Sequence, residues 1–418
     1  MKIAIIGTGI SGLGAAHILS QKHDITLYEK NDYVGGHSRT VDIKTPDANL
    51  CVDTGFIVFN ERNYPHLLAL FSDLGVPVTK SNMSFGVSIN EGWLEYSTSS
   101  LMKCFAQKRN TVRPDFLRML ADIVKFHKMA ITHQTASSDV SLGDWLEQLN
   151  LGPWFRDYFL LPMGGAIWSM PVEKMLSYPA STFIRFFENH GLLGVNDAPQ
   201  WYTVIGGSRN YVDQISKNFR SRIKLNCAVK QVIRQNDRVD IIDEQNETTS
   251  YDQVVFACHS DQALALLCSP TTEEQQILGS INYQQNVVVL HTDSRYMPKR
   301  KSAWSSWVYL SNHKNDKSES MSVSYWMNNL QPLETNTPII VTLNPSEMPR
   351  HDLIYDQTIL DHPLFNSAAI KAQSSLDLIQ GKDRIWYCGA WQGYGFHEDG
   401  LSSAVQMTGK MGVLPSWC

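Results

Sequence analysis

A glycine-rich hexapeptide near the N-terminus has the spacing of a phosphate-binding turn. Gly7-Thr8-Gly9-Ile10-Ser11-Gly12 matches the pattern G-x-G-x-x-G. In such a turn the first glycine allows a tight bend, the second lets the backbone approach a pyrophosphate, and the third lets the next helix lie close to the preceding strand. The phosphates then lie at the positive end of that helix. The pattern therefore predicts a bound dinucleotide, held by Gly7, Gly9, Ile10, Ser11 and Gly12.

An acidic residue follows at the distance expected of a ribose ligand. Glu29 directly follows the apolar run Ile25–Tyr28 and lies 17 positions after Gly12. A carboxylate at the end of this second strand accepts hydrogen bonds from ribose hydroxyls and repels the additional phosphate of NADP. We predict that Glu29 and the adjacent Lys30 hold the adenosine half of the dinucleotide.

A second glycine pair favours FAD over NAD. Gly35-Gly36-His37-Ser38-Arg39-Thr40 suits a second segment that closes over a larger dinucleotide. The forked donors of Arg39 could bridge the pyrophosphate, and the alternative is a surface arginine after a turn. Gly55 and Phe56 follow in a small loop, near where an isoalloxazine would lie. The predicted FAD contacts in this part of the chain are Gly36, His37, Ser38, Arg39, Thr40, Gly55 and Phe56.

These motifs require the strands and helices of a doubly wound fold to position them. Residues 3–6 form a short apolar run typical of a strand buried in a parallel sheet, and residues 15–19 continue as a helix. With the strand at 25–28 they complete a βαβ unit of the usual ~30 residues. A second parallel-type unit is predicted from four later runs, at 223–226, 229–234, 238–242 and 253–257. A last strand is predicted at 384–389, before a helix over about 401–410.

The nucleotide-binding features thus lie at the beginning, middle and end of the chain. We predict an α/β fold in which a doubly wound, Rossmann-type FAD-binding domain is interrupted by a mixed α+β substrate domain. The FAD-binding domain comprises residues 1–80, 196–262 and 381–418, and the discontinuous substrate domain comprises 81–195 and 263–380.

The order of these motifs resembles the flavin-containing amine oxidase superfamily, which includes protoporphyrinogen oxidase-like and phytoene desaturase-like enzymes. The resemblance covers residues 2–56, Val229, Ala257 and residues 388–409. It implies that Val229 meets the adenine through its backbone and that Ala257 also contacts FAD. It further implies that the C-terminal segment holds the flavin through Gly389, Asp399, Gly400 and Leu401.

A narrower resemblance concerns residues 35–40, 52–59, 297–307 and 395–400. These segments resemble a bacterial branch of NAD/FAD-binding proteins whose relatives are associated with cyclopropane or other modified fatty-acid synthesis. The resemblance implies an acyl substrate. Amine-oxidising members of the superfamily place a lysine near flavin N5. The local candidates here are Lys299 and Lys301, and that basic run is more typical of an exposed turn.

Two polar residues next to the expected flavin position are candidates for acid–base catalysis. His397 could act as an acid or base near pH 7, with Glu398 beside it. The alternative interpretation is structural, because acidic residues at a helix start stabilise the helix dipole and cap its first amides. His37 invites the idea of covalent flavin attachment, but we expect non-covalent binding.

Residues 101–130 form a basic, helical segment. It carries seven Lys or Arg and two Asp, for a formal charge of +5, and its apolar positions keep helical spacing. Such a face could contact an anionic membrane or an acyl carrier, and the alternative is a solvated helix with its apolar stripe in the core. The apolar run 160–168 is predicted to form a pocket wall. The clusters of Trp and Tyr could be core or pocket lining.

Bulk composition excludes several other classes of protein. The 418 residues carry a net charge of −5, which argues against nucleic-acid binding. The seven cysteines contain no close Cys-x-x-Cys pair, so neither a disulfide framework nor a metal site is predicted. We see no signal peptide and no apolar stretch of the ~20 residues that span a bilayer, so a cytoplasmic location is expected.

Together these features predict an FAD-dependent oxidoreductase that transfers a hydride from an apolar, fatty-acyl or lipid-like substrate to flavin N5. Two alternatives stay open from the sequence. One is a flavin-dependent double-bond isomerase without net oxidation, and the other is a non-catalytic flavoprotein subunit of a lipid-modifying system. The electron acceptor and the oligomeric state are not predicted.

Overall fold

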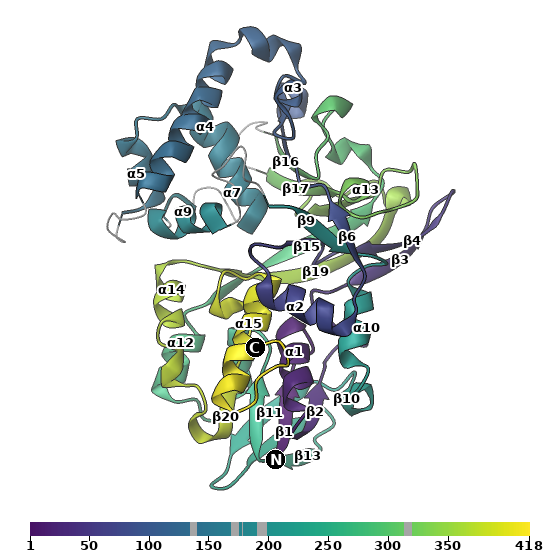
Figure 1. The fold of residues 1–418 in the computed structure, drawn as a ribbon, viewed down its shortest axis with the longest axis vertical. Coiled ribbons are helices and arrows are strands. Elements are labelled where there is room, and N and C mark those ends of the chain that lie inside the picture. The colour runs from purple at the N-terminus through teal and green to yellow at the C-terminus, as the bar shows by residue number, and fades with distance from the viewer. Residues whose placement is uncertain (134–139, 169–174, 178, 190–198, 313–319) are drawn as a thin grey trace.

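A five-stranded parallel sheet forms the lower half of the molecule (Figure 1). The computed structural model describes residues 1–133, 140–168, 175–177, 179–189, 199–312 and 320–418. The sheet has the order β10-β2-β1-β14-β20. Its strands are β1 (Lys2–Ile6), β2 (Asp24–Tyr28), β10 (Ile223–Lys224), β14 (Gln253–Phe256) and β20 (Ile385–Tyr387). All four pairings are parallel, which agrees with the predicted doubly wound fold.

Two helices bring their N-termini to the carboxyl end of β1. Helix α1 (Ile10–Leu19) follows β1 through the glycine turn, and α15 (His397–Lys410) packs along it. Nine of the ten residues of α1 are buried, as expected of a helix covered on both sides. Gly400 makes the close crossing possible, because a Cβ there would lie 2.8 Å from both the Ile10 Cγ2 and the Ser11 Oγ atoms.

The predicted second parallel unit is wrong for two of its four runs. Strands β11 (Val229–Arg234), β12 (Val239–Asp243) and β13 (Thr248–Tyr251) form a separate antiparallel sheet. Only four residues connect each consecutive pair of these strands. Such a link closes a hairpin, whereas a parallel crossover needs about a dozen residues or more. The short polar turns were therefore the signal for the antiparallel arrangement.

A seven-stranded sheet lies above the parallel one (Figure 1). Its order is β19-β15-β18-β17-β16-β7-β8, and only the β16–β7 pairing is parallel. The strands are β7 (Phe85–Ile89), β8 (Leu94–Ser97), β15 (Asn282–His291), β16 (Trp307–Asn312), β17 (Ser320–Trp326), β18 (Ile340–Leu343) and β19 (Ile354–Leu364).

A group of helices covers this sheet at the top of the molecule (Figure 1). Its members are α3 (Leu101–Cys104), α4 (Pro114–His133), α5 (Leu142–Gln148), α6 (Pro153–Phe155), α7 (Leu161–Trp168) and α9 (Ala180–Asn189). Phe126, Trp145 and Phe183 belong to their common buried core. The helical segment predicted at 101–130 is divided here into α3, a 3-10 turn at 108–112, and α4. The division falls at Pro114, because a proline can begin a helix but not continue one.

The remaining elements pack beside the two large sheets or run between them. They are β3 (Thr40–Lys44), β4 (Asn49–Asp53), β5 (Phe59–Asn60), α2 (Pro65–Leu74), β6 (Val78–Ser81), β9 (Trp201–Val204), α10 (Arg209–Ser216), α11 (Ser260–Leu266), α12 (Thr272–Leu278), α13 (Met327–Leu330) and α14 (Ser367–Gln373). The predicted domain boundary at 195–196 lies outside the described residues, so the domain division stays a prediction. In the part of the chain that the structure describes, no helix is both long and apolar enough to cross a membrane.

Candidate active site

One cavity of about 1930 Å³ extends from the glycine turn after β1 to the covering helices. Its wall includes Gly9 and Glu29 at one end and Leu120, Phe159 and Met163 at the other. Ligand sites usually have volumes of ~300–1,000 Å³. This cavity therefore has room for a large cofactor and a second molecule.

The cavity wall next to α1 consists of glycine backbone at Gly7, Gly9 and Gly36, which we call the glycine cradle. Gly7 has a φ of +104°, and a Cβ there would lie 2.9 Å from the Ala257 carbonyl oxygen. Gly9 has no atom within 4 Å of where a Cβ would be, and a Cβ on Gly36 would lie 3.1 Å from the Gly9 Cα. The two predicted glycine loops are thus in contact. A pyrophosphate can approach such a surface closely, at the N-terminus of α1 where backbone N–H groups are available. The residues present fit a dinucleotide.

The Glu29 carboxylate lies buried at the end of β2, on the cavity wall. Its Oε2 accepts hydrogen bonds from the Thr8 backbone N at 3.1 Å and the Thr8 Oγ1 at 2.5 Å. Its Oε1 accepts from the Asn31 backbone N at 3.0 Å and the Asn31 Nδ2 at 2.9 Å. A ribose would take the place of the two side-chain donors, which can rotate away, while the two backbone donors keep the carboxylate oriented.

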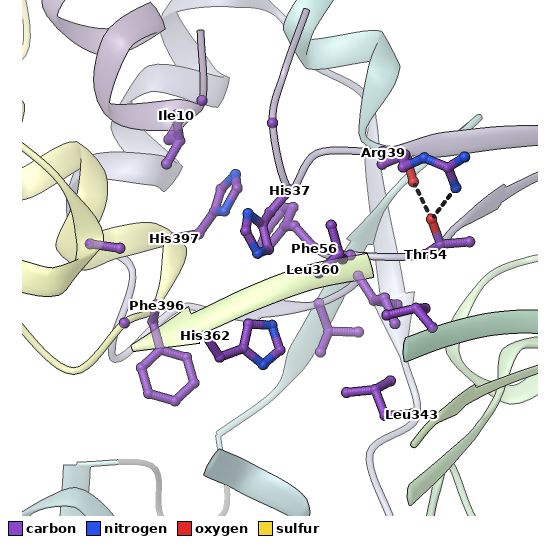
Figure 2. A pocket seen from close by; sticks show the side chains of 18 of the residues that line it. Ile10, His37, Arg39, Thr54, Phe56, Leu343, Leu360, His362, Phe396 and His397 are labelled. Carbon is purple, nitrogen blue, oxygen red and sulfur yellow. Dashed lines mark hydrogen bonds between the residues drawn. The ribbon is translucent and has the colours of Figure 1, made fainter. Parts of the chain in front are cut away.

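Arg39 also reaches the cavity wall, but its charge already has a partner. The guanidinium binds Asp356 through two hydrogen bonds of 2.6 and 3.0 Å. It also donates to the Thr54 Oγ1 at 3.1 Å (Figure 2). These bonds to Asp356 raise the pKa of Arg39. The structure thus ties Arg39 to β19, an ion pair that sequence reasoning missed because Asp356 lies 317 positions away.

His397 is held by three residues around the cavity. Its ring stacks on Phe56 with centroids 3.8 Å apart and an interplanar angle of 9°. Its Nε2 lies 2.6 Å from the Tyr211 hydroxyl and 3.1 Å from the Ser38 Oγ, and those two hydroxyls also bond each other. Burial, with repulsion from His37, lowers the pKa of His397 to about 3. The ring is therefore neutral near pH 7, which favours a role in hydrogen bonding over one as a cationic acid.

Three of the other histidines that line this cavity, His37, His259 and His362, lie near one another. The ring centroid of His37 lies 5.6 Å from that of His362 and 6.3 Å from that of His259. Figure 2 shows His37, His362 and His397 projecting from different segments toward one space. Burial and mutual repulsion lower the pKa of His259 and of His362 to about 3, and burial lowers that of His37. The group thus lines the cavity as neutral imidazoles. The sequence offered no motif for His259 or His362.

Glu398 makes the contacts of a helix cap. Its Oε1 accepts from the His66 backbone N at 2.9 Å and its Oε2 from the Leu67 backbone N at 3.0 Å, which are first-turn amides of α2. Burial raises the pKa of Glu398 to about 7. Asp399 similarly accepts from the backbone N atoms of Tyr394 and Phe396, at 3.0 and 2.9 Å. These contacts match the structural interpretation of the two acids.

The structure brings most of the predicted FAD contacts together. Those on the cavity wall are Gly7, Gly9, Ile10, Ser11, Glu29, Lys30, Gly36, His37, Arg39, Gly55, Phe56, Val229, Ala257 and Gly389. Those behind it are Gly12, Ser38, Thr40, Asp399, Gly400 and Leu401, of which Thr40 donates to Asp53 at 2.6 Å. Their contacts with FAD stay predictions.

The far end of the cavity is apolar and partly aromatic. The predicted wall segment 160–168 contributes Met163, and the wall there further includes Met83, Leu120, Ile123, Phe159, Trp307, Tyr325, Leu343 and Phe365. Some clustered aromatics thus line the cavity, whereas others, such as Trp304 and Trp326, pack against each other in a core.

Charged side chains are few on this wall. Its acidic residues, within the described ranges, are Glu29 at the cradle and Asp361 beside the histidines, and its lysines are Lys30 and Lys80, both exposed. Lys299 lies on the surface and pairs with Glu91 at 3.7 Å, and Lys301 is exposed as well. Neither lines the cavity. This placement agrees with the interpretation of the basic run as an exposed turn.

The family model for flavin-containing amine oxidoreductases matches residues 10–353. A putative flavin-containing monoamine oxidase, AofH of Mycobacterium tuberculosis, is 25% identical over 261 residues, which are 59% of this chain and 54% of that protein. The match thus spans about half the length of that relative.

Two further proteins share a short stretch of sequence or the fold. The 4,4'-diapophytoene desaturase of Staphylococcus aureus is 60% identical over 37 residues, which are 9% of this chain and 7% of that protein. Among solved structures, the CLA-producing fatty acid isomerase from P. acnes superposes with a TM-score of 0.70 at 16% identity, over 98% of both chains. At that identity the likeness shows a common fold.

Proposed function

The chain belongs to the flavin-containing amine oxidoreductase family, and we propose that it is an FAD-dependent oxidoreductase that oxidises an apolar, fatty-acyl or lipid-like substrate. The resemblance to the flavin-containing amine oxidase superfamily is thereby confirmed. The observation that carries the proposal is the continuity of one cavity from the glycine cradle to an apolar, aromatic wall. Within the described ranges, the acids on that wall lie at the cradle and beside the histidines, which leaves the far end suited to a hydrocarbon.

We propose that the cradle holds FAD as the motifs predict. Gly7, Gly9 and Gly36 would receive the pyrophosphate, Glu29 the ribose, and the backbone of Val229 the adenine. Gly55, Phe56 and Gly389 would lie along the flavin half. When bound, the flavin supplies a hydride acceptor at N5. Gly400 and Asp399 would act from behind the wall, by seating α15 against α1 and ordering the loop at 394–396.

The protein's own residues would orient the substrate and exclude water. Apolar side chains such as Leu120, Phe159 and Trp307 bind a hydrocarbon without needing a charged partner. Neutral imidazoles, His397 first among them, would donate or accept single hydrogen bonds at the polar end of the substrate. His397 is kept in place by Phe56 and Tyr211, so we propose that it positions the substrate. Glu398, whose oxygens are engaged by α2, is not proposed to act on it.

Double-bond isomerisation without net oxidation is the second candidate. It is favoured by the fatty acid isomerase, which shares this fold over 98% of its chain. An amine substrate is less favoured, because the lysines on the described cavity wall lie exposed and the apolar end carries no acid. We also propose that residues 101–130 contact a lipid surface or an acyl carrier, as their basic charge suggests.

Anaerobic mixing of the holoenzyme with candidate substrates tests these proposals. We expect the flavin absorbance to bleach with an unsaturated fatty acyl lipid and to persist with putrescine or a simple aromatic monoamine. A shifted double bond in the recovered lipid, with the flavin still oxidised at the end, would assign the isomerase. Bleaching by the amines alone would contradict the proposed substrate class. Unchanged lipids and an unchanged flavin spectrum across a broad lipid panel would favour the non-catalytic role.

A further inference from the structure

Apolar side chains project into solvent from the helices next to the far end of the cavity. Leu101 and Met102 of α3 are 74% and 85% exposed, and Val112 in the following 3-10 turn is 79% exposed. Leu117 and Val124 of α4 are 42% and 49% exposed. These five residues form what we call the mouth patch. Exposed apolar side chains gathered in this way usually mark a contact surface.

The mouth patch is continuous with the cavity. Leu101 and Val124 are exposed and also line the cavity. On α4, the cavity-lining positions Leu120, Ile123, Val124 and His127 follow the spacing of one helix face. Leu117 lies one turn before Leu120 and two turns before Val124, at the edge of this cavity-lining face. One helix therefore presents apolar side chains to the cavity and, next to them, to solvent, so the patch adjoins the cavity.

The surface around the mouth patch is basic. Residues 101–130 carry a formal charge of +5 in a chain whose net charge is −5. One of the two aspartates, Asp122, is buried, accepts from the Gly152 backbone N at 2.9 Å and pairs with Arg118 at 3.8 Å, which leaves the other six Lys and Arg of this segment to set its positive charge. Lys103, Lys108 and Arg109 are exposed between the apolar positions. Apolar residues interspersed with Lys and Arg are typical of segments that lie in the interface of an anionic bilayer.

We propose that α3, the 3-10 turn at 108–112 and α4 dock on an anionic phospholipid bilayer. The mouth patch enters the acyl boundary, and the neighbouring Lys and Arg side chains contact lipid phosphates. An acyl chain then passes from the bilayer into the cavity without crossing water. This last clause rests on the proposed function, whereas the docking itself does not. For this docking, α3 and α4 need only lie along the bilayer surface, with the side chains of the mouth patch inserted into it.

Vesicle co-sedimentation tests the docking on the FAD-loaded, full-length protein. The probes are vesicles of phosphatidylcholine alone and vesicles with equal parts of phosphatidylglycerol. We expect binding to the anionic vesicles at low salt and a large loss of binding at high salt, because salt screens exposed charges. Met102→Asp with Val112→Asp should weaken binding at least tenfold, since both side chains would insert. Lys103→Glu with Lys108→Glu should remove the preference for anionic vesicles.

The matched control replaces exposed apolar residues elsewhere, Leu378→Asp with Leu414→Asp. This variant should bind vesicles as the parent protein does, and all variants should retain stoichiometric FAD and an unchanged melting temperature. Failure of the parent protein to bind anionic vesicles, or equal binding by the Met102/Val112 variant, would overturn the proposal. So would binding of acyl carrier protein at the same residues without vesicle binding. Vesicle binding without any reaction of the lipid would leave the docking intact and contradict the proposed function alone.

Discussion

At the scale of single residues, Glu29 is the side chain whose role is defined most sharply by its contacts. Its carboxylate is buried and oriented by Thr8 and Asn31 at the edge of the glycine cradle. Arg39 differs, because Asp356 already neutralises it. The motifs alone predict both residues as FAD ligands, but these contacts predict a larger effect on FAD binding for Glu29 and a larger effect on stability for Arg39.

Glu29→Gln should weaken FAD binding on the order of 10- to 100-fold, as expected when a charged hydrogen-bond acceptor worth roughly 1.5–3 kcal/mol is lost. Arg39→Ala should weaken it less, because its charge is paired with Asp356, and should instead lower the melting temperature by leaving that carboxylate unpaired. Equilibrium titration of the apoprotein with FAD measures the first effect and thermal unfolding the second. Exposed Glu247→Gln is the control. Full FAD affinity in Glu29→Gln would contradict the assigned ribose site.

Glu398 gives stability a predictable dependence on pH. Burial raises its pKa in the folded protein from 4.5 to about 7. A group whose pKa is raised by folding stabilises most below its unfolded pKa, and this contribution is lost as pH rises toward the folded value. The parent protein should therefore lose stability relative to Glu398→Gln between pH 4.5 and about 7, by at most ~3 kcal/mol.

Urea unfolding of both FAD-loaded proteins across this range measures the difference. Asp399 titrates in both proteins, so its contribution cancels in the comparison. A constant difference in unfolding free energy from pH 4.5 to 7 would show that Glu398 does not keep a raised pKa.

At the scale of elements, the crossing of α1 and α15 positions the cradle. Gly400 lies where the two helices touch, whereas Gly409 lies near the other end of α15, where a Cβ would meet only the Leu414 Cδ2 at 3.3 Å. Gly400→Ala should destabilise the protein by about 1–3 kcal/mol through overpacking and should weaken FAD binding. Gly409→Ala should be neutral or slightly stabilising, because alanine favours a helix interior by ~1 kcal/mol. Thermal unfolding with FAD titration compares them, and equal behaviour of the two variants would contradict the close crossing.

The elements also show what the sequence can predict. The strands at 3–6, 25–28 and 253–256, the glycine turn and the final helix were predictable, because buried strands and phosphate turns leave local patterns of residue type. The antiparallel sheet of β11–β13 was missed because the runs were interpreted by residue type, whereas the four-residue turns between them, too short for a parallel crossover, carried the direction. Tyr211, His259, His362 and Asp356 were missed for a different reason. They come from segments distant in the sequence. Only the tertiary fold brings His259 and His362 to the cavity wall, Tyr211 to His397 and Asp356 to Arg39.

At the scale of the whole molecule, the large cavity predicts that activity depends on the length of the substrate's acyl chain. Ile123→Trp would fill part of the apolar end, on the cavity face of α4. We expect this variant to keep FAD and to react with short apolar substrates, while its kcat/KM for long acyl chains falls by at least tenfold. Ala121→Trp, on the exposed side of the same helix, is the control. Anaerobic stopped-flow reduction with a chain-length series in detergent measures the effect. An equal loss for all lengths would argue against occupation of this end by the chain.

The order in which the strands of the parallel sheet occur along the chain has a consequence for biosynthesis. Its central strand β1 is made before the other strands of the sheet, whereas its edge strand β20 and the helix α15 are made after them. Until residues 385–410 leave the ribosome, the edge of β14 lacks its partner and α1 lacks its covering helix. Between the synthesis of β14 and that of β20, the nascent chain therefore has an incomplete sheet, with an unpaired strand edge available to aggregation or to chaperones. The helix pair beside the glycine turn is for the same reason complete only once α15 has been made.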